Sequence, residues 1–98
     1  MATGTIKNQH TGTWTEVNAN LKYQVRSGIV FVWARGNGSN TSWATVGTLP
    51  SSVRPSENYY NSALAYGSSL SNYYVDTDGS VQHRGSSGVE IIMSHPLP

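Results

Sequence analysis

The sequence predicts an all-β domain, an antiparallel barrel or sandwich of about seven or eight short strands. Three observations support this fold class. Apolar residues do not recur at the i, i+3, i+4 spacing of an amphipathic helix. Short stretches with strand-like patterning recur along the chain. Turn-forming residues, including 10 glycines and 4 prolines, separate these stretches.

The clearest local prediction is a hairpin made by residues 21–26 and 29–35. The first stretch, LKYQVR, alternates apolar and polar residues, so one of its faces should be buried and the other solvated. Ser27-Gly28 provides a tight turn. The second stretch, IVFVWAR, is apolar on both faces, so we expect it to be covered by its own core and by a second surface. An earlier strand is expected over 14–17.

The middle of the chain alternates between strands and irregular segments. Residues 36–40 predict a flexible polar loop, and 42–46 a short strand. The segment 47–55 contains two prolines, which keep it out of any central strand. Residues 59–66 predict a strand with small inward side chains, which ends at the Gly-Ser-Ser of 67–69.

The C-terminal third predicts a second hairpin and a last strand. Residues 73–75 and 80–84 flank Asp-Thr-Asp-Gly at 76–79, a strong hairpin signal because an Asp-Gly pair tolerates positive φ. The Gly-Ser-Ser-Gly of 85–88 forms another turn, and 89–93 the final strand.

Size and composition limit the classes of function. We expect one domain over 1–98, with residues 1–11 as a disordered segment or an extended arm. There is no cysteine, so such a small domain gains no stability from disulfides, and oligomerisation is the remaining way to bury more surface. Charged residues make up 11% of the chain and the net charge is +1, which argues against nucleic acid or an anionic membrane as partner. No apolar stretch approaches a membrane span.

Residues that could support catalysis are few. Asp76 and Asp78 are the only carboxylates close in sequence, and they lie in the predicted turn, where Asp side chains bind the local backbone. The histidines, His10, His83 and His95, are far apart. We therefore expect no enzyme activity, no metal site and no cofactor.

The aromatic residues are more informative, because Trp and Tyr combine an apolar body with a polar tip suited to interfaces and to stacking on sugars. Trp33 is expected in the core or at a subunit interface, and Trp14 in the core or against the N-terminal segment. Trp43 follows the polar loop and could border a binding site. The doublets Tyr59-Tyr60 and Tyr73-Tyr74 should each place one ring inside and one outside the sheet, where it serves an interface or a ligand.

Polar residues after the Asp-Gly hairpin complete a hypothetical saccharide site. His83 and Arg84 lie in the strand opposite 73–76. Asp, His and Arg side chains can bind a polyol through hydrogen bonds while a nearby aromatic ring stacks on it. The predicted ligand-binding residues are Trp43, Tyr60, Tyr74, Asp76, His83 and Arg84.

One set of motifs resembles a known module. It consists of Trp43-x-x-Val46-Gly47-Thr48-Leu49-Pro50, Arg54-Pro55, the turn with Asp76, Asp78, Gly79 and Val81, and Gly88 followed by the apolar 89–93. This pattern is similar to the C-terminal head domain of the tail-fibre and baseplate receptor-binding proteins of siphophages that infect Gram-positive bacteria. The resemblance covers roughly residues 12–94.

The resemblance implies more than the residues themselves do. Such heads are β-barrels that form homotrimers, and several bind host cell-wall saccharides. Only structural positions carry over by motif: Leu49, Pro50, Arg54 and Pro55 as the turn that shapes the barrel, and Gly79 as the hairpin turn. These proteins usually carry an N-terminal shoulder and neck, which this chain lacks. It is therefore expected to be a head domain or a small protein with the same fold.

Three functions follow as hypotheses. The first is a phage receptor-binding head that recognises host-surface saccharide as a homotrimer, in contact with other tail proteins of the virion. The second is a structural tail-assembly module with the same fold and no ligand. The third is a monomeric carbohydrate-binding module. A cleft with an aromatic ring beside convergent polar side chains favours the first hypothesis over the second, and trimers in solution exclude the third.

Overall fold

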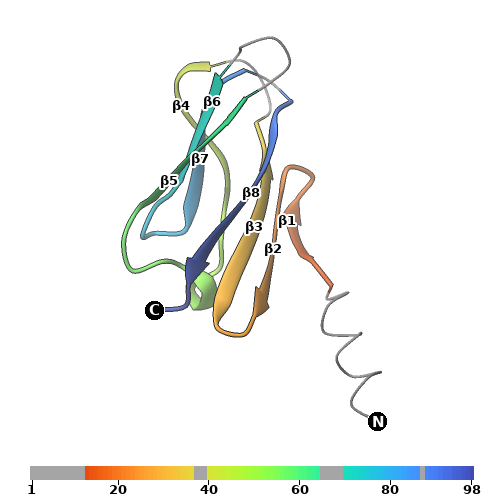
Figure 1. The fold of residues 1–98 in the computed structure, drawn as a ribbon, viewed down its shortest axis with the longest axis vertical. Coiled ribbons are helices and arrows are strands. Elements are labelled where there is room, and N and C mark those ends of the chain that lie inside the picture. The colour runs from red at the N-terminus through yellow and green to blue at the C-terminus, as the bar shows by residue number, and fades with distance from the viewer. Residues whose placement is uncertain (1–12, 37–39, 65–69, 87) are drawn as a thin grey trace.

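In the computed structural model, residues 13–36, 40–64, 70–86 and 88–98 are described, and they fold into two antiparallel sheets packed face to face (Figure 1). The elements are β1 (Thr15–Asn18), β2 (Leu21–Arg26), β3 (Ile29–Arg35), β4 (Asn40–Thr48), the 3-10 helix η1 (Ser51–Val53), β5 (Tyr59–Leu64), β6 (Leu70–Val75), β7 (Ser80–Gly85) and β8 (Glu90–Pro96). The predicted all-β class is confirmed.

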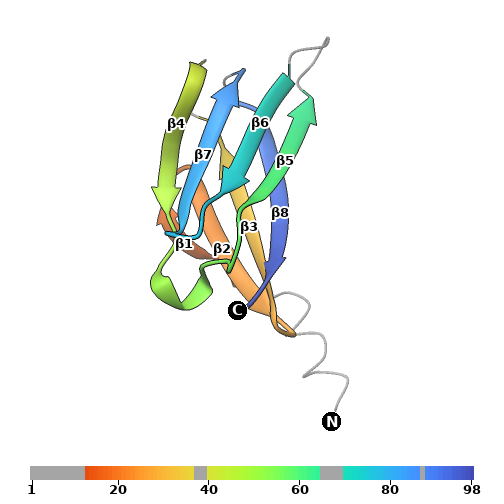
Figure 2. The same ribbon diagram turned by 90° about the vertical axis from the view of Figure 1, so that its left-hand side faces the viewer.

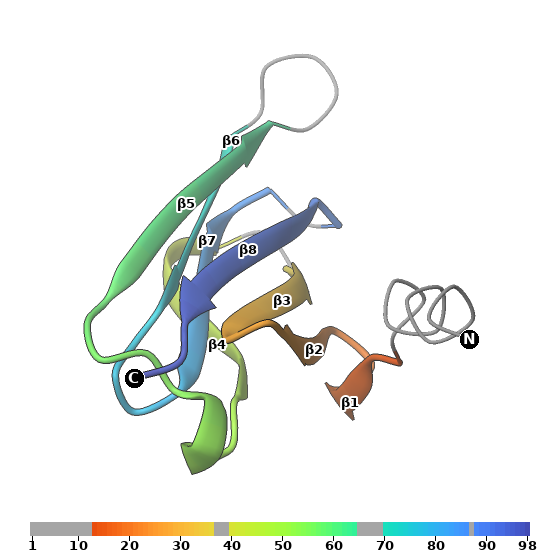
Figure 3. The ribbon, with the colours of Figure 1, turned by 60° about the horizontal axis from the view of Figure 1, so that its bottom comes forward.

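The two sheets form a sandwich. One sheet has the order β1-β2-β3-β8 and the other the order β4-β7-β6-β5. Figure 2 shows the second sheet in front of the first, and Figure 3 shows both layers from the end where η1 lies. The edges of the layers touch without ladder pairing: the Asn18 side-chain amide donates to the Val46 carbonyl at 3.0 Å, and the Tyr59 and His95 rings lie 5.8 Å apart. Of the two predicted architectures, the sandwich is therefore the one observed.

The hairpin over 21–26 and 29–35 is confirmed residue for residue, with Leu21 paired to Ala34 and Arg26 to Ile29. Its turn places Ser27 and Gly28 at positive φ, 53° and 78°. Among the described residues, the expected second cover over the outer face of β3 is not found. The side chains that point toward the other sheet are buried, whereas those on the outer face are only half-buried. Trp33 lies on that outer face and not in the core.

Other predicted boundaries shift by a few residues. β4 begins at Asn40, inside the predicted loop, because its first residues pair with the end of β7. β6 begins at Leu70, three residues early, because 70–72 pair with β5. β8 continues to Pro96 because β3 pairs with it along its whole length. The predicted N-terminal arm 1–11, the loop residues 37–39 and the turn 67–69 lie outside the described residues.

The core between the sheets is built from inward side chains of the strands, together with Leu49 after β4 and Val53 of η1. It comprises Leu21, Val30, Val32, Ala34, Leu49, Val53, Tyr73, Val75, Val81 and Met93. Most are β-branched or aliphatic, which suits a pleated surface that packs on a second one.

Tyr73 is the largest fully buried side chain, and its hydroxyl joins the two layers. The hydroxyl accepts the Gly36 backbone N–H at 2.9 Å, at the end of β3, and donates to the Val89 carbonyl just before β8. Burial raises the pKa of the Tyr73 phenol, so the group remains a neutral donor. One phenol thus satisfies two backbone groups that would otherwise be buried without a partner.

The segment 49–55 is anchored to the Asp-Gly hairpin, in which Gly79 forms the turn that the resemblance implied. Leu49 N–H donates to the Gly79 carbonyl at 2.8 Å, and Arg54 Nε donates to the Leu49 carbonyl at 3.1 Å. Gly79 has φ +89°, and a Cβ there would lie 2.5 Å from the Leu49 carbonyl oxygen. Only glycine therefore fits this turn.

Replacing Tyr73 by Phe is expected to destabilise the fold by roughly 1–3 kcal/mol, because the Gly36 N–H and the Val89 carbonyl would both lose their buried partner. The free energy of unfolding from urea titration measures this effect. Tyr74→Phe, in which the adjacent outward ring loses the same hydroxyl, is the matched control and should change stability by less than about 0.5 kcal/mol. Equal losses in the two variants would contradict the bridging role.

Candidate functional site

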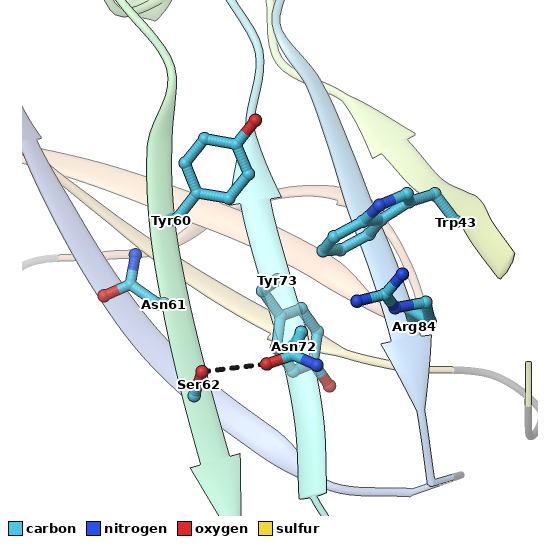
Figure 4. A pocket seen from close by; sticks show the side chains of 7 residues that line it. All are labelled: Trp43, Tyr60, Asn61, Ser62, Asn72, Tyr73 and Arg84. Atoms are coloured by element: carbon cyan, nitrogen blue, oxygen red, sulfur yellow. Dashed lines mark hydrogen bonds between the residues drawn. The ribbon is translucent and has the colours of Figure 1, made fainter. Parts of the chain in front are cut away.

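The outer face of the sheet β4-β7-β6-β5 carries a shallow groove of about 580 Å³ (Figure 4). Outward side chains line it from β4, β5, β6 and β7, namely Trp43, Tyr60, Ser62, Asn72 and Arg84. Asn61 and Tyr73, whose side chains point to the other side of the sheet, also border it. The outward positions follow from strand alternation, since Tyr60 and Ser62 are two apart on β5, and Asn72 and Tyr74 two apart on β6. The groove is thus open to solvent on the face opposite the core.

Three aromatic rings and one guanidinium form a continuous row across the four strands. The Tyr60 and Tyr74 rings stack with centroids 5.0 Å apart, because these two residues are paired in the β5–β6 ladder. Trp43 meets Tyr74 edge-on at 4.7 Å. The Arg84 guanidinium lies 4.9 Å from the centre of the Trp43 indole, a cation–π arrangement. We call these four residues the aromatic row.

Polar groups lie beside the aromatic row. The Ser62 hydroxyl donates to the Asn72 Oδ1 atom at 2.9 Å, so the two side chains hold each other in place (Figure 4). In the same sheet, the Gln82 amide donates to the Thr45 hydroxyl at 2.9 Å. With Arg84, these residues offer hydroxyl, amide and guanidinium groups that can exchange hydrogen bonds with a polar ligand.

The aromatic row is more exposed at one end than in its middle. Tyr60 is 67% exposed, whereas Tyr74 is partly covered by the rings on either side of it. Desolvation raises the pKa of the Tyr74 phenol, and the nearby Asp76 carboxylate adds to the shift. The phenol is therefore a neutral hydrogen-bonding group near pH 7.

Four of the six predicted site residues are brought together: Trp43, Tyr60, Tyr74 and Arg84 form the aromatic row. Asp76 lies at the end of β6, where its carboxylate accepts the Thr77 backbone N–H at 2.6 Å. It does not line the groove, because its own turn holds the side chain. The turn role expected for Asp78 agrees with the bond from the Ser80 N–H, which also lowers the pKa of the Asp78 carboxyl.

The expectation for His83 needs correction. Its side chain is 1% exposed and points into the interior, since it follows the buried Val81 by two residues. Its Nε2 atom lies 3.1 Å from the Ser86 carbonyl oxygen, and its ring packs 4.9 Å from the Tyr73 ring. A Cβ on Gly36 would lie 2.3 Å from the imidazole, so the backbone covers the ring closely. His83 is a core residue and cannot reach a ligand in the groove.

Sequence reasoning missed Ser62 and Asn72, the polar pair beside the aromatic row. The signal that could have found them is the two-residue period: each is two positions from a tyrosine already assigned to the outer face. Their meeting across two strands also requires the β5–β6 register, in which Ser62 pairs with Asn72.

Metal-binding clusters and membrane-spanning helices are the other kinds of feature that the described residues could provide. Among the described residues, no group of three or more His, Cys, Asp or Glu side chains could hold a metal ion. Within those ranges, no helix has the length and hydropathy to cross a membrane.

Comparison with known proteins concerns the fold of the chain. No protein-family model matches the chain, and no curated protein matches it by sequence. Among solved structures, it is similar to the head domain of phage bIL170, studied as a receptor-binding domain of lactococcal phages. The TM-score is 0.59 at 18% identity, over 88% of this chain and 98% of that one. The likeness shows a shared fold, so the resemblance inferred from the sequence is confirmed at that level.

Burial of His83 predicts that the protein is less stable in mild acid. Desolvation lowers the pKa of this imidazole below its ordinary value of 6.5, so the unfolded chain takes up a proton before the folded one. The contribution to stability is complete above pH 6.5 and is lost as the pH falls toward the lower folded pKa. Thermal melting followed by circular dichroism should show the midpoint falling between about pH 7.5 and about pH 5.

The variant His83→Gln isolates this effect, because the amide can still donate to the Ser86 carbonyl but does not titrate. Its midpoint should depend less steeply on pH over the same interval than that of the wild type. Two parallel pH profiles would show that His83 does not contribute.

Proposed function

We propose that this chain is a receptor-binding head domain of a phage tail or baseplate, and that it recognises host cell-surface saccharide with the outer face of β4-β7-β6-β5. In this proposal it acts as a homotrimer on the virion, attached to other tail proteins, and meets the host from outside the cell. The observation that carries the proposal is the aromatic row with the Ser62–Asn72 pair beside it.

The chemistry of the groove suits a saccharide. A pyranose presents C–H groups on one face, which pack on aromatic rings, and hydroxyls at its rim, which need hydrogen-bond partners. Tyr60 and Trp43 supply exposed ring surface, while Asn72, Ser62 and Arg84 supply donors and acceptors within the same groove. The groove is shallow and spans four strands, which fits a chain of sugars better than a small enclosed metabolite.

The fold supports a role in receptor binding by a phage. The bIL170 head domain, to which the structure is similar, is described as a receptor-binding domain of a lactococcal phage. The outer face of a rigid sheet is also a suitable scaffold, because β-strands fix the positions of the contact residues better than loops do.

Trp43→Ala is expected to weaken saccharide binding about tenfold, equivalent to about 1.4 kcal/mol, because the groove loses a ring and Arg84 loses its platform. Arg84→Ala should have an effect of similar size. The measurement is binding to an array of cell-wall saccharides from Gram-positive bacteria, followed by titration calorimetry with the best ligand.

Leu70→Ala is the matched control, since Leu70 is exposed on β6 but does not line the groove. It should bind as the wild type does. Binding that survives Trp43→Ala and Arg84→Ala unchanged would place the ligand elsewhere. An array without any bound saccharide would favour the assembly module.

A further inference from the structure

The ladder registers arrange the outward side chains around the groove in two neighbouring rungs across the sheet. In the strand order β5, β6, β7, β4, the first rung is Tyr60, Tyr74, Gln82 and Thr45. The second rung is Ser62, Asn72, Arg84 and Trp43. Trp43 belongs to the second rung because its neighbour Ala44 pairs with the residue before Arg84. The aromatic row therefore crosses from one rung to the other and follows a diagonal of the face.

A polar pair lies on each side of this diagonal. Ser62 and Asn72, the first polar pair, occupy the β5–β6 half of the second rung. Gln82 and Thr45 occupy the β7–β4 half of the first rung, where the Gln82 amide donates to the Thr45 hydroxyl at 2.9 Å. We call them the second polar pair. Figure 4 shows the Arg84 guanidinium on the Asn72 side of the indole, so the row separates the two pairs.

The second polar pair keeps hydrogen-bonding capacity for a ligand. Its internal bond uses one Gln82 N–H and one lone pair of the Thr45 oxygen. The Gln82 carbonyl oxygen, its other amide N–H and the Thr45 O–H are not used by that bond. Thr45 is exposed and Gln82 is half-buried. Since each side chain already holds the other in place, a ligand would have little side-chain entropy to remove.

The distribution of polar groups sets the direction in which a chain of sugars can extend from the first polar pair. Along β6, the next outward residue before Asn72 is Leu70, which is 48% exposed and has no polar side-chain atom. In the opposite direction lies Asp76, whose carboxylate accepts both the Thr77 N–H and the Thr77 hydroxyl. The path across the strands, toward β7 and β4, instead leads to the second polar pair.

One sugar unit cannot reach both polar pairs. Neighbouring strands lie about 4.8 Å apart, so the four strands extend over roughly 14 Å. A pyranose ring is similar in size to one aromatic ring and covers only part of that width. The ring centroids of the row are 5.0 Å apart from Tyr60 to Tyr74 and 4.7 Å apart from Tyr74 to Trp43. Successive sugar units can therefore follow the row from one polar pair to the other.

We infer that Thr45 and Gln82 form a second sugar subsite, and that the saccharide is a chain of at least two units that crosses the strands from β5 to β4. Tyr60 and the first polar pair bind one unit, and Trp43 and the second polar pair bind the next. The inference rests on the proposed function. It adds the minimum length of the saccharide, its direction on the sheet and a further pair of specificity-determining residues.

The dependence of affinity on saccharide length tests the second subsite. The probe is the wall polysaccharide selected on the array, hydrolysed by mild acid and separated by size into fractions of one unit and of two units. The wild type should bind the two-unit fraction about tenfold more tightly, as expected for two additional hydrogen bonds. The double variant Thr45→Val/Gln82→Met keeps side chains of similar size without their polar atoms. It should lose this gain and bind the one-unit fraction as the wild type does.

Thr48→Val is the matched control, because Thr48 is exposed on the same strand but belongs to neither rung. This variant should keep the gain in full. A second measurement requires no mutation. In nitrogen-15 NMR spectra of the wild type, the two-unit fraction should shift the side-chain amide of Gln82, and the one-unit fraction should leave it unchanged.

Three results would overturn the inference while the array still shows binding. They are equal affinities of the wild type for one unit and two, a Gln82 amide that the two-unit fraction does not shift, and equal losses for both fractions in the double variant. Each would leave the proposed function intact. An array without any bound saccharide would refute the proposed function and the second subsite together, so the two failures are distinguishable.

Discussion

The alternation of side chains along each strand is the constraint on which the whole structure depends. In each tyrosine doublet the two rings must point to opposite sides of a sheet. Tyr73 therefore enters the core and bonds Gly36 and Val89, while Tyr74 joins the outer aromatic row. Tyr59 packs near His95 between the sheets, while Tyr60 stacks on Tyr74 outside. The residues that hold the layers together are thus the immediate neighbours of those that form the groove.

This coupling makes the groove rigid. Tyr73 is fixed by the core and by its two backbone hydrogen bonds, and the ladder pairing of β5 with β6 fixes the spacing of the outward rings. The groove would be preorganised for a ligand, so binding would cost less conformational entropy of the side chains. The two outer faces of the sandwich then differ in chemistry: one presents rings with hydroxyls and amides, and the other an apolar stripe with a mixed-charge rim.

The sequence predicts most of the strands, but it does not predict to which side of the sheet every side chain points. Local patterns predict the hairpin of β2 and β3 and the Asp-Gly turn. Apolar–polar alternation indicates a strand, and glycine indicates a turn position with positive φ. His83 and Arg84 were expected to act together, although adjacent strand residues face opposite ways. Val81 marks the buried side, and it could have assigned His83 to the core. The pairing of β4 with β7 joins distant segments through two irregularities, and no local pattern specifies it.

The proposed saccharide-binding surface is the outer face of β4-β7-β6-β5. A nitrogen-15 NMR titration with the saccharide selected on the cell-wall array tests it most directly, because the shifts report the contact surface residue by residue without any mutation. We expect the largest changes at the Trp43 indole N–H, the Asn72 side-chain amide and the backbone amides around Tyr60 and Arg84. Shifts concentrated on β2, β3 and β8, with the Trp43 indole unchanged, would contradict it.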